Sequence, residues 1–407
     1  MKPSLIKFPI VFTIASTLAL LSIVSAEDWP NWRGPNRNGV SDEESWRVDW
    51  PTTGPPIQWK ANVGTGFSSV VVSKGRAFTV GNRDNTDTVF CLEADSGKVL
   101  WQHSYESPLN DKFFEGGPTA TPTVDGERVF TLSQAGDLFC FAVTTGDILW
   151  SKNIANEADV RAPGWGFGGS PVVHDDKLLL AVGEAGTAVD KTTGELLWSS
   201  DDKDAGYATP HLLKHDGNWL MLVASGKYFH AVDVDTGQER WRHKWLTRFG
   251  CNAADPIVVA QTVFISSGYN RGSALLRFTA GEPEEVWKTK EYQNQFSSSV
   301  LLDGYLYGVD GDTTGERTLK CIELKTGEVQ WSHEGFGSGA LIAAGKRLII
   351  LSETGELVIA DASPVAFRQV TRGSVLEGKC WTAPTLANGR VYCRSADGEV
   401  ACVDLRP

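Results

Sequence analysis

Aromatic, amide and cationic side chains recur in short glycine-bearing segments, and this combination suits a site for a polar ligand. In the segment Arg161-Ala-Pro-Gly-Trp165-Gly-Phe167, a cation accompanies two aromatic rings. Aromatic faces stack on planar or sugar-like ligands, while arginine or lysine pairs with a carboxylate. We therefore predict these ligand-binding residues: Arg161, Trp165, Phe167, Asn252, Asp255, Tyr269, Asn270, Arg271, Asn294, Gln295, Lys379 and Trp381. The alternative is that they fill a central channel and satisfy backbone groups of loops.

The sequence contains none of the common catalytic or metal-binding motifs. The histidines are scattered, without His-Glu-x-x-His spacing or a Cys-x-x-Cys-His haem attachment site, and no Gly-x-Ser-x-Gly elbow occurs. Asp310-Gly-Asp312-Thr-Thr-Gly315 resembles the start of a calcium loop, but Cys321 takes the place of the glutamate that completes such a loop. We interpret this segment as a polar hairpin, and we assign no catalytic residue and no metal ligand.

The elements that position the candidate residues follow from an internal repeat. One copy reads Cys91-Leu-Glu-Ala-Asp-Ser-Gly97-Lys-Val-Leu-Trp101. Four more copies keep the glycine and the tryptophan: Cys140–Trp150, Ala188–Trp198, Ala231–Trp241 and Cys321–Trp331. Tryptophans at this position recur every 42 to 49 residues, which is typical of a four-stranded propeller blade. We expect the tryptophans to be core residues between blades.

Each repeat also predicts its other strands. A first strand of small residues often carries proline, as in Ala120-Thr-Pro122, and an apolar second strand follows, as in Arg128–Leu132. The third and fourth strands flank the Thr-Gly or Ser-Gly turn, where glycine supplies the backbone angles of a tight hairpin. Strands such as Asp137–Val143 are apolar at consecutive positions, which indicates burial on both faces of the sheet.

The two ends of the chain predict a closed ring. The last repeat stops at Pro407 before a fourth strand, whereas Pro55–Trp59 reads as a fourth strand without the preceding three. Repeat ends at Trp59, Trp101, Trp150, Trp198, Trp241, Trp287, Trp331 and Phe367 give eight blades. The fold class is therefore all-β: an eight-bladed propeller of four-stranded antiparallel blades, closed by an N-terminal strand. We expect the propeller over residues 55–407, an N-terminal segment over 27–54 and a signal peptide over 1–26.

Export is indicated by the first residues. Lys2 and Lys7 precede an apolar run, and Val24-Ser-Ala26 offers a small-residue cleavage site. A membrane anchor is the alternative, but the run is short and no stop-transfer charges follow it. The mature protein is expected to be periplasmic or secreted, without a transmembrane segment, and monomeric. A net charge of −12 with dispersed lysine and arginine argues against a nucleic-acid partner.

Cysteines fall into two groups. Cys91, Cys140, Cys321 and Cys402 share a repeat position that is alanine in other copies, so we expect free, buried thiols. Neighbouring blades are about 10 Å apart, beyond the reach of a disulfide. The other three are Cys251, Cys380 and Cys393, and a disulfide between two of them stays open.

The pattern small-x-Asp-x-x-Thr-Gly-x-x-x-Trp, seen in Ala188–Trp198, and the opening Trp29-Pro-Asn-Trp32-Arg-Gly-Pro-Asn36 resemble the pyrroloquinoline quinone (PQQ)-like β-propeller repeat family. Its exported bacterial members are often named alcohol or polyvinyl alcohol dehydrogenases. The resemblance implies PQQ with calcium as cofactors if the protein is an enzyme. The large quinoprotein alcohol dehydrogenases carry an adjacent cysteine pair, which this chain lacks. At the level of the fold, the chain also resembles the propeller lipoprotein of the outer-membrane barrel-assembly machinery, although no lipid-acceptor cysteine follows the apolar run.

Two functions remain open at this point. The first, which we favour, is a non-catalytic scaffold or recognition protein of the cell envelope, whose loop face binds an envelope protein, a peptide, a polysaccharide or a small polar ligand. The second is a PQQ-dependent dehydrogenase that oxidises an alcohol or sugar, that is, a quinoprotein oxidoreductase. The cofactor-specific residues of the second were not found in the sequence.

Overall fold

A computed structural model describes residues 27–51, 53–112, 114–200, 205–278, 281–313 and 315–407. The predicted signal peptide lies outside these residues. Among them, no helix is long and apolar enough to cross a membrane.

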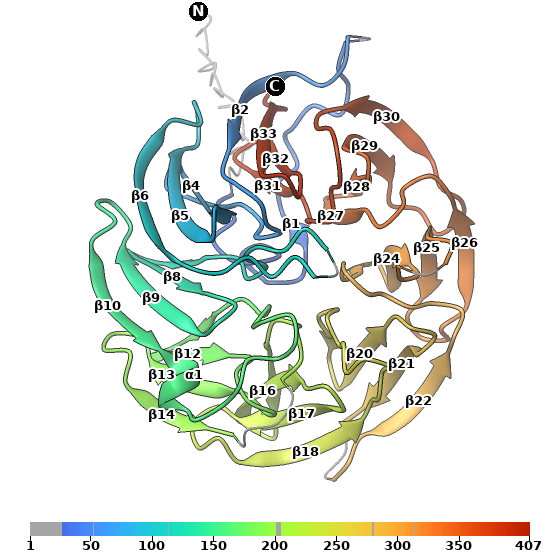
Figure 1. The fold of residues 1–407 in the computed structure, drawn as a ribbon. Coiled ribbons are helices and arrows are strands. Elements are labelled where there is room, and N and C mark those ends of the chain that lie inside the picture. The colour runs from blue at the N-terminus through green and yellow to red at the C-terminus, as the bar shows by residue number, and fades with distance from the viewer. Residues whose placement is uncertain (1–26, 52, 113, 201–204, 279–280, 314) are drawn as a thin grey trace, which may run out of the picture.

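The described strands form eight small antiparallel sheets arranged in a ring (Figure 1). Blade 1 consists of β3 (Val71–Ser73), β4 (Arg76–Arg83), β5 (Thr86–Glu93) and β6 (Val99–Glu106), and blade 2 consists of β7 (Thr123–Asp125), β8 (Arg128–Leu132), β9 (Asp137–Ala142) and β10 (Ile148–Asn153). Blade 3 consists of β11 (Val172–His174), β12 (Lys177–Leu180), β13 (Thr187–Asp190) and β14 (Leu196–Ser199), and blade 4 consists of β15 (His211–His215), β16 (Asn218–Ala224), β17 (Tyr228–Asp233) and β18 (Glu239–Lys244).

The second half of the ring repeats the same order. Blade 5 consists of β19 (Ile257–Val259), β20 (Thr262–Ser267), β21 (Gly272–Arg277) and β22 (Glu284–Thr289), and blade 6 consists of β23 (Val300–Leu302), β24 (Tyr305–Asp310), β25 (Thr318–Glu323) and β26 (Val329–His333). Blade 7 consists of β27 (Ala340–Ala344), β28 (Arg347–Leu351), β29 (Glu356–Asp361) and β30 (Gln369–Ser374), and blade 8 consists of β31 (Thr385–Ala387), β32 (Arg390–Arg394), β33 (Glu399–Asp404) and β2 (Ile57–Asn62). The predicted eight-bladed propeller is confirmed.

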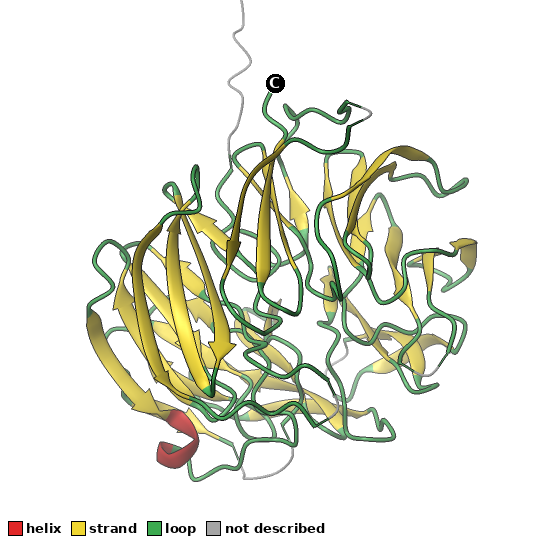
Figure 2. Ribbon diagram, turned by 45° about the horizontal axis from the view of Figure 1, so that its top comes forward, coloured by secondary structure: helices red, strands yellow, loops and turns green. Residues whose placement is uncertain are grey.

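The ring closes in blade 8, as the sequence predicts. The N-terminal strand β2 pairs antiparallel with the C-terminal strand β33, with Trp59 opposite Cys402. Two elements were not predicted: β1 (Val40–Ser41) pairs parallel with β27 at the inner edge of blade 7, and a short helix α1 (Ile154–Glu157) follows β10. Figure 2 shows α1 as an isolated turn beside the sheets.

The repeated tryptophans join each blade to the next one. The indole N–H groups of Trp59, Trp101, Trp150, Trp198, Trp287 and Trp331 donate to backbone carbonyls of the following blade at 2.8–3.2 Å. The turn glycine of that blade lies against the indole. At Gly146, for example, φ is +77° and an added Cβ would lie 2.5 Å from Trp101. The glycine is therefore required both by the turn and by the packing of blades.

Phe367 is a correction to the predicted repeat. It lies in the turn before β30, and the residue that pairs with β29 where tryptophan stands in other blades is Thr371, opposite Ile359. Phe367 instead packs against Trp331 of the preceding blade at 5.9 Å between ring centroids. A phenylalanine thus covers the indole that glycine-bearing turns cover elsewhere. The blade count is unaffected, because β30 still forms the fourth strand.

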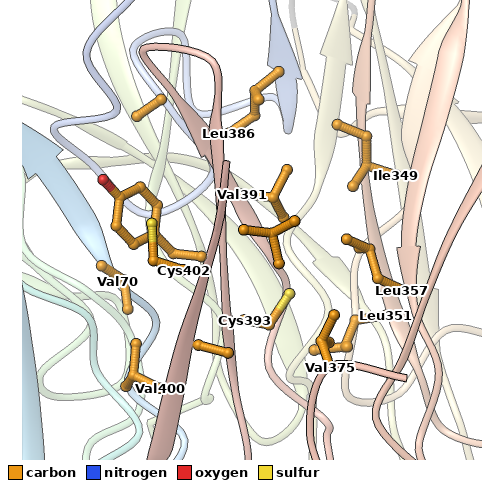
Figure 3. Close-up of a cluster of buried hydrophobic side chains, with 14 of the residues drawn as sticks. Val70, Ile349, Leu351, Leu357, Val375, Leu386, Val391, Cys393, Val400 and Cys402 are labelled. Carbon is orange, nitrogen blue, oxygen red and sulfur yellow. The ribbon is translucent and has the colours of Figure 1, made fainter. Parts of the chain in front are cut away.

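The core consists of apolar side chains between neighbouring blades. Figure 3 shows one such layer, in which Val391 and Cys393 of blade 8 lie near Ile349 and Leu357 of blade 7. All seven cysteines are buried and free. Burial on this scale is the main stabilising contribution to such a fold.

A fully buried arginine connects the closing blade to blade 1. The guanidinium of Arg394 donates to the carbonyl oxygens of Ser68, Val80 and Gly64 and to the Thr79 hydroxyl, at 2.6–3.0 Å. Burial lowers the pKa of Arg394 to about 9. These bonds tie the last repeat to the first one at the point where the chain must close the ring.

Candidate functional site

The loops that carry the candidate residues lie at one end of the ring, which we call the loop face. Loops between consecutive blades bond there to hairpins between second and third strands. Examples are the bond from the Val63 amide to the Gly398 carbonyl at 2.8 Å and the bond from the Phe167 amide to the Gln134 carbonyl at 3.0 Å. The inter-blade loops and these hairpins therefore form one continuous surface.

A belt of side-chain oxygens lies below this face, around the central channel. In five successive blades, the backbone N–H of one belt residue donates to the side-chain oxygen of the next at 2.8–3.0 Å. The belt residues are Ser69, Thr121, Ser170, Thr209, Asp255 and Ser298. A small polar residue precedes proline in the repeat because its side-chain oxygen accepts a buried backbone N–H of the preceding blade.

Asp255 differs from the other belt residues because its side chain has a second oxygen, which makes further contacts. That oxygen accepts the Trp32 indole N–H at 2.7 Å and lies 3.9 Å from the guanidinium of Arg33. Burial raises the pKa of Asp255, opposed by the Arg33 charge, and burial lowers the pKa of Arg33. The carboxylate predicted to bind a ligand therefore binds the N-terminal segment of its own chain.

Residues 29–41 of that segment, here called the N-terminal plug, contact the inner strands of the ring. Trp29 bridges to Val72 of blade 1, the Pro30 carbonyl accepts the Val124 amide of blade 2, and β1 extends blade 7. Figure 1 shows β1 near the centre of the ring. The plug thus occupies the channel, at the end opposite to the loop face.

His211 lies in the same channel. It is the first residue of β15 and is half-buried, and the charges of Arg33 and Arg37 from the plug act on it. Burial, together with the charges of Arg33 and Arg37, lowers the pKa of His211 to about 4. The imidazole is therefore neutral at physiological pH.

At the other end, stacked aromatic rings cover the channel mouth. The Trp381 ring stacks on Phe296 at 4.5 Å with an interplanar angle of 11°, and Phe67 stacks on Trp381 at 5.8 Å. Phe114 packs against Phe67 at 5.6 Å, and its loop between β6 and β7 runs across the centre of the ring (Figure 1). The rings come from loops of several blades, so tertiary structure alone brings them together.

Ion pairs surround this aromatic stack. Lys379 pairs with Glu115 at 2.6 Å and lies 4.2 Å from the centre of the Trp381 ring. Glu353 accepts the Trp381 indole N–H at 2.8 Å and lies 3.6 Å from Arg317. The predicted residues Lys379 and Trp381 do lie together on the loop face, but both have partners within the protein.

Four predicted residues are buried among protein partners. The Asn252 amide donates to the Ser225 carbonyl, the Asn294 amide donates to the Val309 carbonyl, and Gln295 accepts the Gly268 amide. The fourth, Phe167, is fully buried in a core cluster. In this structure the three amide side chains bond to backbone groups of the protein, and a ligand role for these four residues stays a prediction.

Tyr269, Asn270 and Arg271 form one turn, in which Asn270 is exposed and the other two residues are half-buried. Tyr269 and Asn270 have φ near +57°, a left-handed conformation that a tight turn requires. Arg271 stacks over Trp245 at 3.5 Å, and Tyr269 packs edge-on against Phe249 at 5.0 Å. Burial raises the pKa of Tyr269 to about 12, so its phenol stays protonated.

The segment that carries Arg161 and Trp165 contributes Pro163 and Gly164 to a pocket of about 340 Å³ that opens on the loop face above blades 3 and 4. Trp165 packs edge-on against Tyr207, a lining residue, at 5.5 Å. None of the predicted residues is itself part of the pocket wall, which includes Lys227, Leu246, Thr247, Arg248 and Phe249. The signal was available in the sequence Trp245-Leu-Thr-Arg-Phe-Gly250, a loop between blades with a cation beside an aromatic ring.

One cluster has the order of a hydrolase triad. Ser225 Oγ lies 3.1 Å from His230 Nε2, and His230 Nδ1 lies 2.6 Å from Glu239. The Ser225 hydroxyl is buried and accepts the amides of Lys227 and Tyr228, which is the role of a turn serine. Serines at the same hairpin in other blades, Ser133, Ser352 and Ser395, accept backbone amides in the same way. We therefore assign the cluster a structural role.

The residues at the channel mouth do not fit a bound planar quinone with calcium. The Trp381 ring is already stacked on Phe296, and the carboxylates of Glu115 and Glu353 are paired with cations. In the hairpin that resembles a calcium loop, Asp310 pairs with Lys320 at 2.8 Å and Asp312 accepts the Tyr269 amide. Among the described residues, no group of three or more His, Cys, Asp or Glu side chains is placed to hold a metal ion.

Comparisons with known proteins agree with this fold. A tetrathionate hydrolase of Acidithiobacillus ferrooxidans is 25% identical over 236 residues, which cover 54% of this chain and 45% of that protein, so the match spans less than half of that relative. Outer membrane protein assembly factor BamB of Yersinia pestis is 23% identical over 381 residues, covering 85% of this chain and 88% of that protein.

Solved structures show the same architecture. BamB from Moraxella catarrhalis superposes with a TM-score of 0.64 at 17% identity, covering 86% of this chain and 99% of that chain. A quinohemoprotein alcohol dehydrogenase from Comamonas testosteroni gives 0.64 at 13% identity, covering 94% and 81%. The family model described as outer membrane protein assembly factor BamB matches residues 37–161, 110–333 and 316–406. The chain therefore belongs to this family of PQQ-like β-propellers.

Proposed function

We propose that this protein is a non-catalytic recognition module of the cell envelope that binds a ligand or partner protein through its loop face. The observation that carries the proposal is the contrast between two parts of that face. At the channel mouth, where a quinone would be held, Trp381, Phe296, Lys379 and Glu115 contact one another. The pocket above blades 3 and 4, in contrast, is open and carries cationic and apolar side chains.

The relationship to BamB supports this proposal. Those relatives are named as assembly factors for outer membrane proteins, and one of them matches this chain over most of its length. The N-terminal plug adds support, because Trp32 and Arg33 bind Asp255 inside the channel and leave the loops as the accessible recognition surface. With the signal peptide predicted for residues 1–26, the module would act in the periplasm or outside the cell.

The test uses a photo-cross-linking amino acid at single positions of the full-length protein in its native host. Trp165 reports on the loop face, and Val365, which is 75% exposed on a turn at the opposite end, is the matched control. We expect a discrete adduct from position 165 and none from position 365. Adducts from position 365 alone would contradict recognition through the loop face.

A second measurement addresses the oxidoreductase alternative. The purified protein is titrated with PQQ in the presence of calcium and assayed for alcohol-dependent dye reduction. We expect no saturable change in the quinone absorbance and no dye reduction. Saturable binding together with alcohol-dependent turnover would overturn the non-catalytic role and establish a quinoprotein dehydrogenase.

A further inference from the structure

The pocket on the loop face is built from four loops, which follow β10, β14, β16 and β18. Its volume of about 340 Å³ is at the small end of the range for ligand sites. Its wall includes Tyr207, Lys227, Leu246, Thr247, Arg248 and Phe249. The site has room for one side chain or one small molecule.

The charge of the described lining residues is entirely positive. Lys227 and Arg248 both line the pocket, and neither forms an ion pair with any residue that the structure describes. Cations elsewhere on the loop face differ, because Lys379 and Arg317 lie against carboxylates. In a chain with a net charge of −12, two neighbouring cations without acidic partners favour an anionic ligand.

The same pocket exposes apolar side chains. Phe249 is 53% exposed and Leu246 is 45% exposed, and they stand in the same loop as Arg248. Most other large exposed apolar residues lie on the outer strands or at the opposite turns. An aromatic and an aliphatic side chain on a pocket wall favour a ligand with an apolar part.

Thr247 provides a third kind of group. Its hydroxyl is shielded from solvent and forms no hydrogen bond with any described residue. Buried hydroxyl groups in proteins normally have a partner. The Thr247 hydroxyl has no exposed surface, so a polar atom of a ligand would reach it only after this side chain rotates toward the pocket.

From these three features we infer that the pocket binds a single carboxylate attached to an aromatic or aliphatic group, with the carboxylate between Lys227 and Arg248 and the apolar group against Phe249. Two sources share this chemistry: a free small acid, and the C-terminal residue of a peptide. The inference rests on the proposed recognition function and identifies its ligand class.

The experiment measures binding of three probes by isothermal titration calorimetry: 3-phenylpropionate, a hexapeptide that ends in phenylalanine with a free carboxylate, and the same hexapeptide as its C-terminal amide. We expect an acid to bind saturably, with an affinity that falls as salt is added, and the amide to bind at least about tenfold more weakly. Stronger binding of the peptide than of the small acid assigns the pocket to a C-terminus, and equal binding assigns it to free acids. Equal affinity for acid and amide, or no saturable binding, overturns the inference.

Variants then locate the binding. The double variant Lys227→Gln/Arg248→Gln should weaken the acid probes at least about tenfold and abolish the preference over the amide, and Phe249→Ala should weaken all probes that bind. The matched control is Lys98→Gln/Lys346→Gln, which removes two exposed cations at the opposite end of the ring. Equal losses in both double variants would overturn the assignment. If cross-linking from position 165 still gives adducts and none of the three probes binds, the proposed recognition function is retained and this pocket is rejected as its ligand site.

Discussion

Replacement of Asp255 by asparagine tests whether this carboxylate anchors the N-terminal plug or serves a ligand. In the structure one oxygen accepts the Thr209 amide at 2.9 Å and the other accepts the Trp32 indole at 2.7 Å. Asparagine has one oxygen for these two donors, so one buried donor loses its acceptor, at a cost of about 1–3 kcal/mol.

Arg33 makes the loss larger. Its guanidinium is buried, and Asp255 at 3.9 Å is the carboxylate that faces it. Removing one partner of a buried ion pair costs about 3–5 kcal/mol. The two losses share one side chain and do not add, so we expect Asp255→Asn to lower the free energy of unfolding by about 3–5 kcal/mol in total.

The assay is guanidinium-induced unfolding followed by tryptophan fluorescence. Asp303→Asn, at an exposed turn, is the control and should change the free energy of unfolding by less than about 0.5 kcal/mol. A double-mutant cycle with Arg33→Met should show that the two losses are coupled. If Asp255→Asn changes the free energy of unfolding by less than about 1 kcal/mol, the anchoring role is refuted and Asp255 again becomes a candidate ligand-binding residue.

Three further predictions concern stability and thiol chemistry. Gly237→Ala places a Cβ 2.7 Å from Trp198 at φ +72° and should lower the free energy of unfolding by more than about 2 kcal/mol. The control Gly217→Ala, at φ +84° in open space, should lower it by about 1 kcal/mol. Equal losses for the two variants in denaturant titrations would argue against packing of the turn on the indole. Because folding lowers the pKa of His211 to about 4, the unfolded chain binds a proton at this residue at pH values where the folded protein does not. The free energy of unfolding should therefore decrease by about 2–3 kcal/mol as the pH falls from about 6.5 to 4. Unfolding curves of His211→Gln should lose this part of the pH dependence. Ellman's reagent should react with seven thiols after denaturation and with almost none in the native protein, and rapid native labelling would contradict their burial.

The repeat could be predicted because its signals are local. The spacing of tryptophan and glycine reports one blade at a time, so the blade count could be predicted from the repeat, and Pro55–Trp59 could be predicted as the strand that pairs with β33. Phe367 was misplaced because an aromatic residue in a degenerate turn resembles the missing tryptophan, whereas the pairing of Thr371 with Ile359 is visible only in the sheet.

The contacts of the candidate side chains could not be predicted from the sequence. Sequence identified the loops that reach one face, but it did not separate side chains that support a loop, such as Asn252 and Asn294, from those that line a pocket. Lys227 and Phe249 were missed because they lie in different loops and become neighbours only when the blades pack. Whether the predicted residues bind a ligand stays a prediction.

By itself, the sequence determined the eight-bladed ring, since each blade is specified by a short pattern of turn, apolar strand and tryptophan. Only the tertiary structure decided which polar groups remain available for binding. Asp255 is satisfied by Trp32 from a segment more than two hundred residues away, while Lys227 and Arg248 lack acidic partners among the described residues. The reason is physical: a hydrogen bond or ion pair depends on distances of about 3–4 Å between atoms, and closure of the ring sets those distances independently of position along the chain.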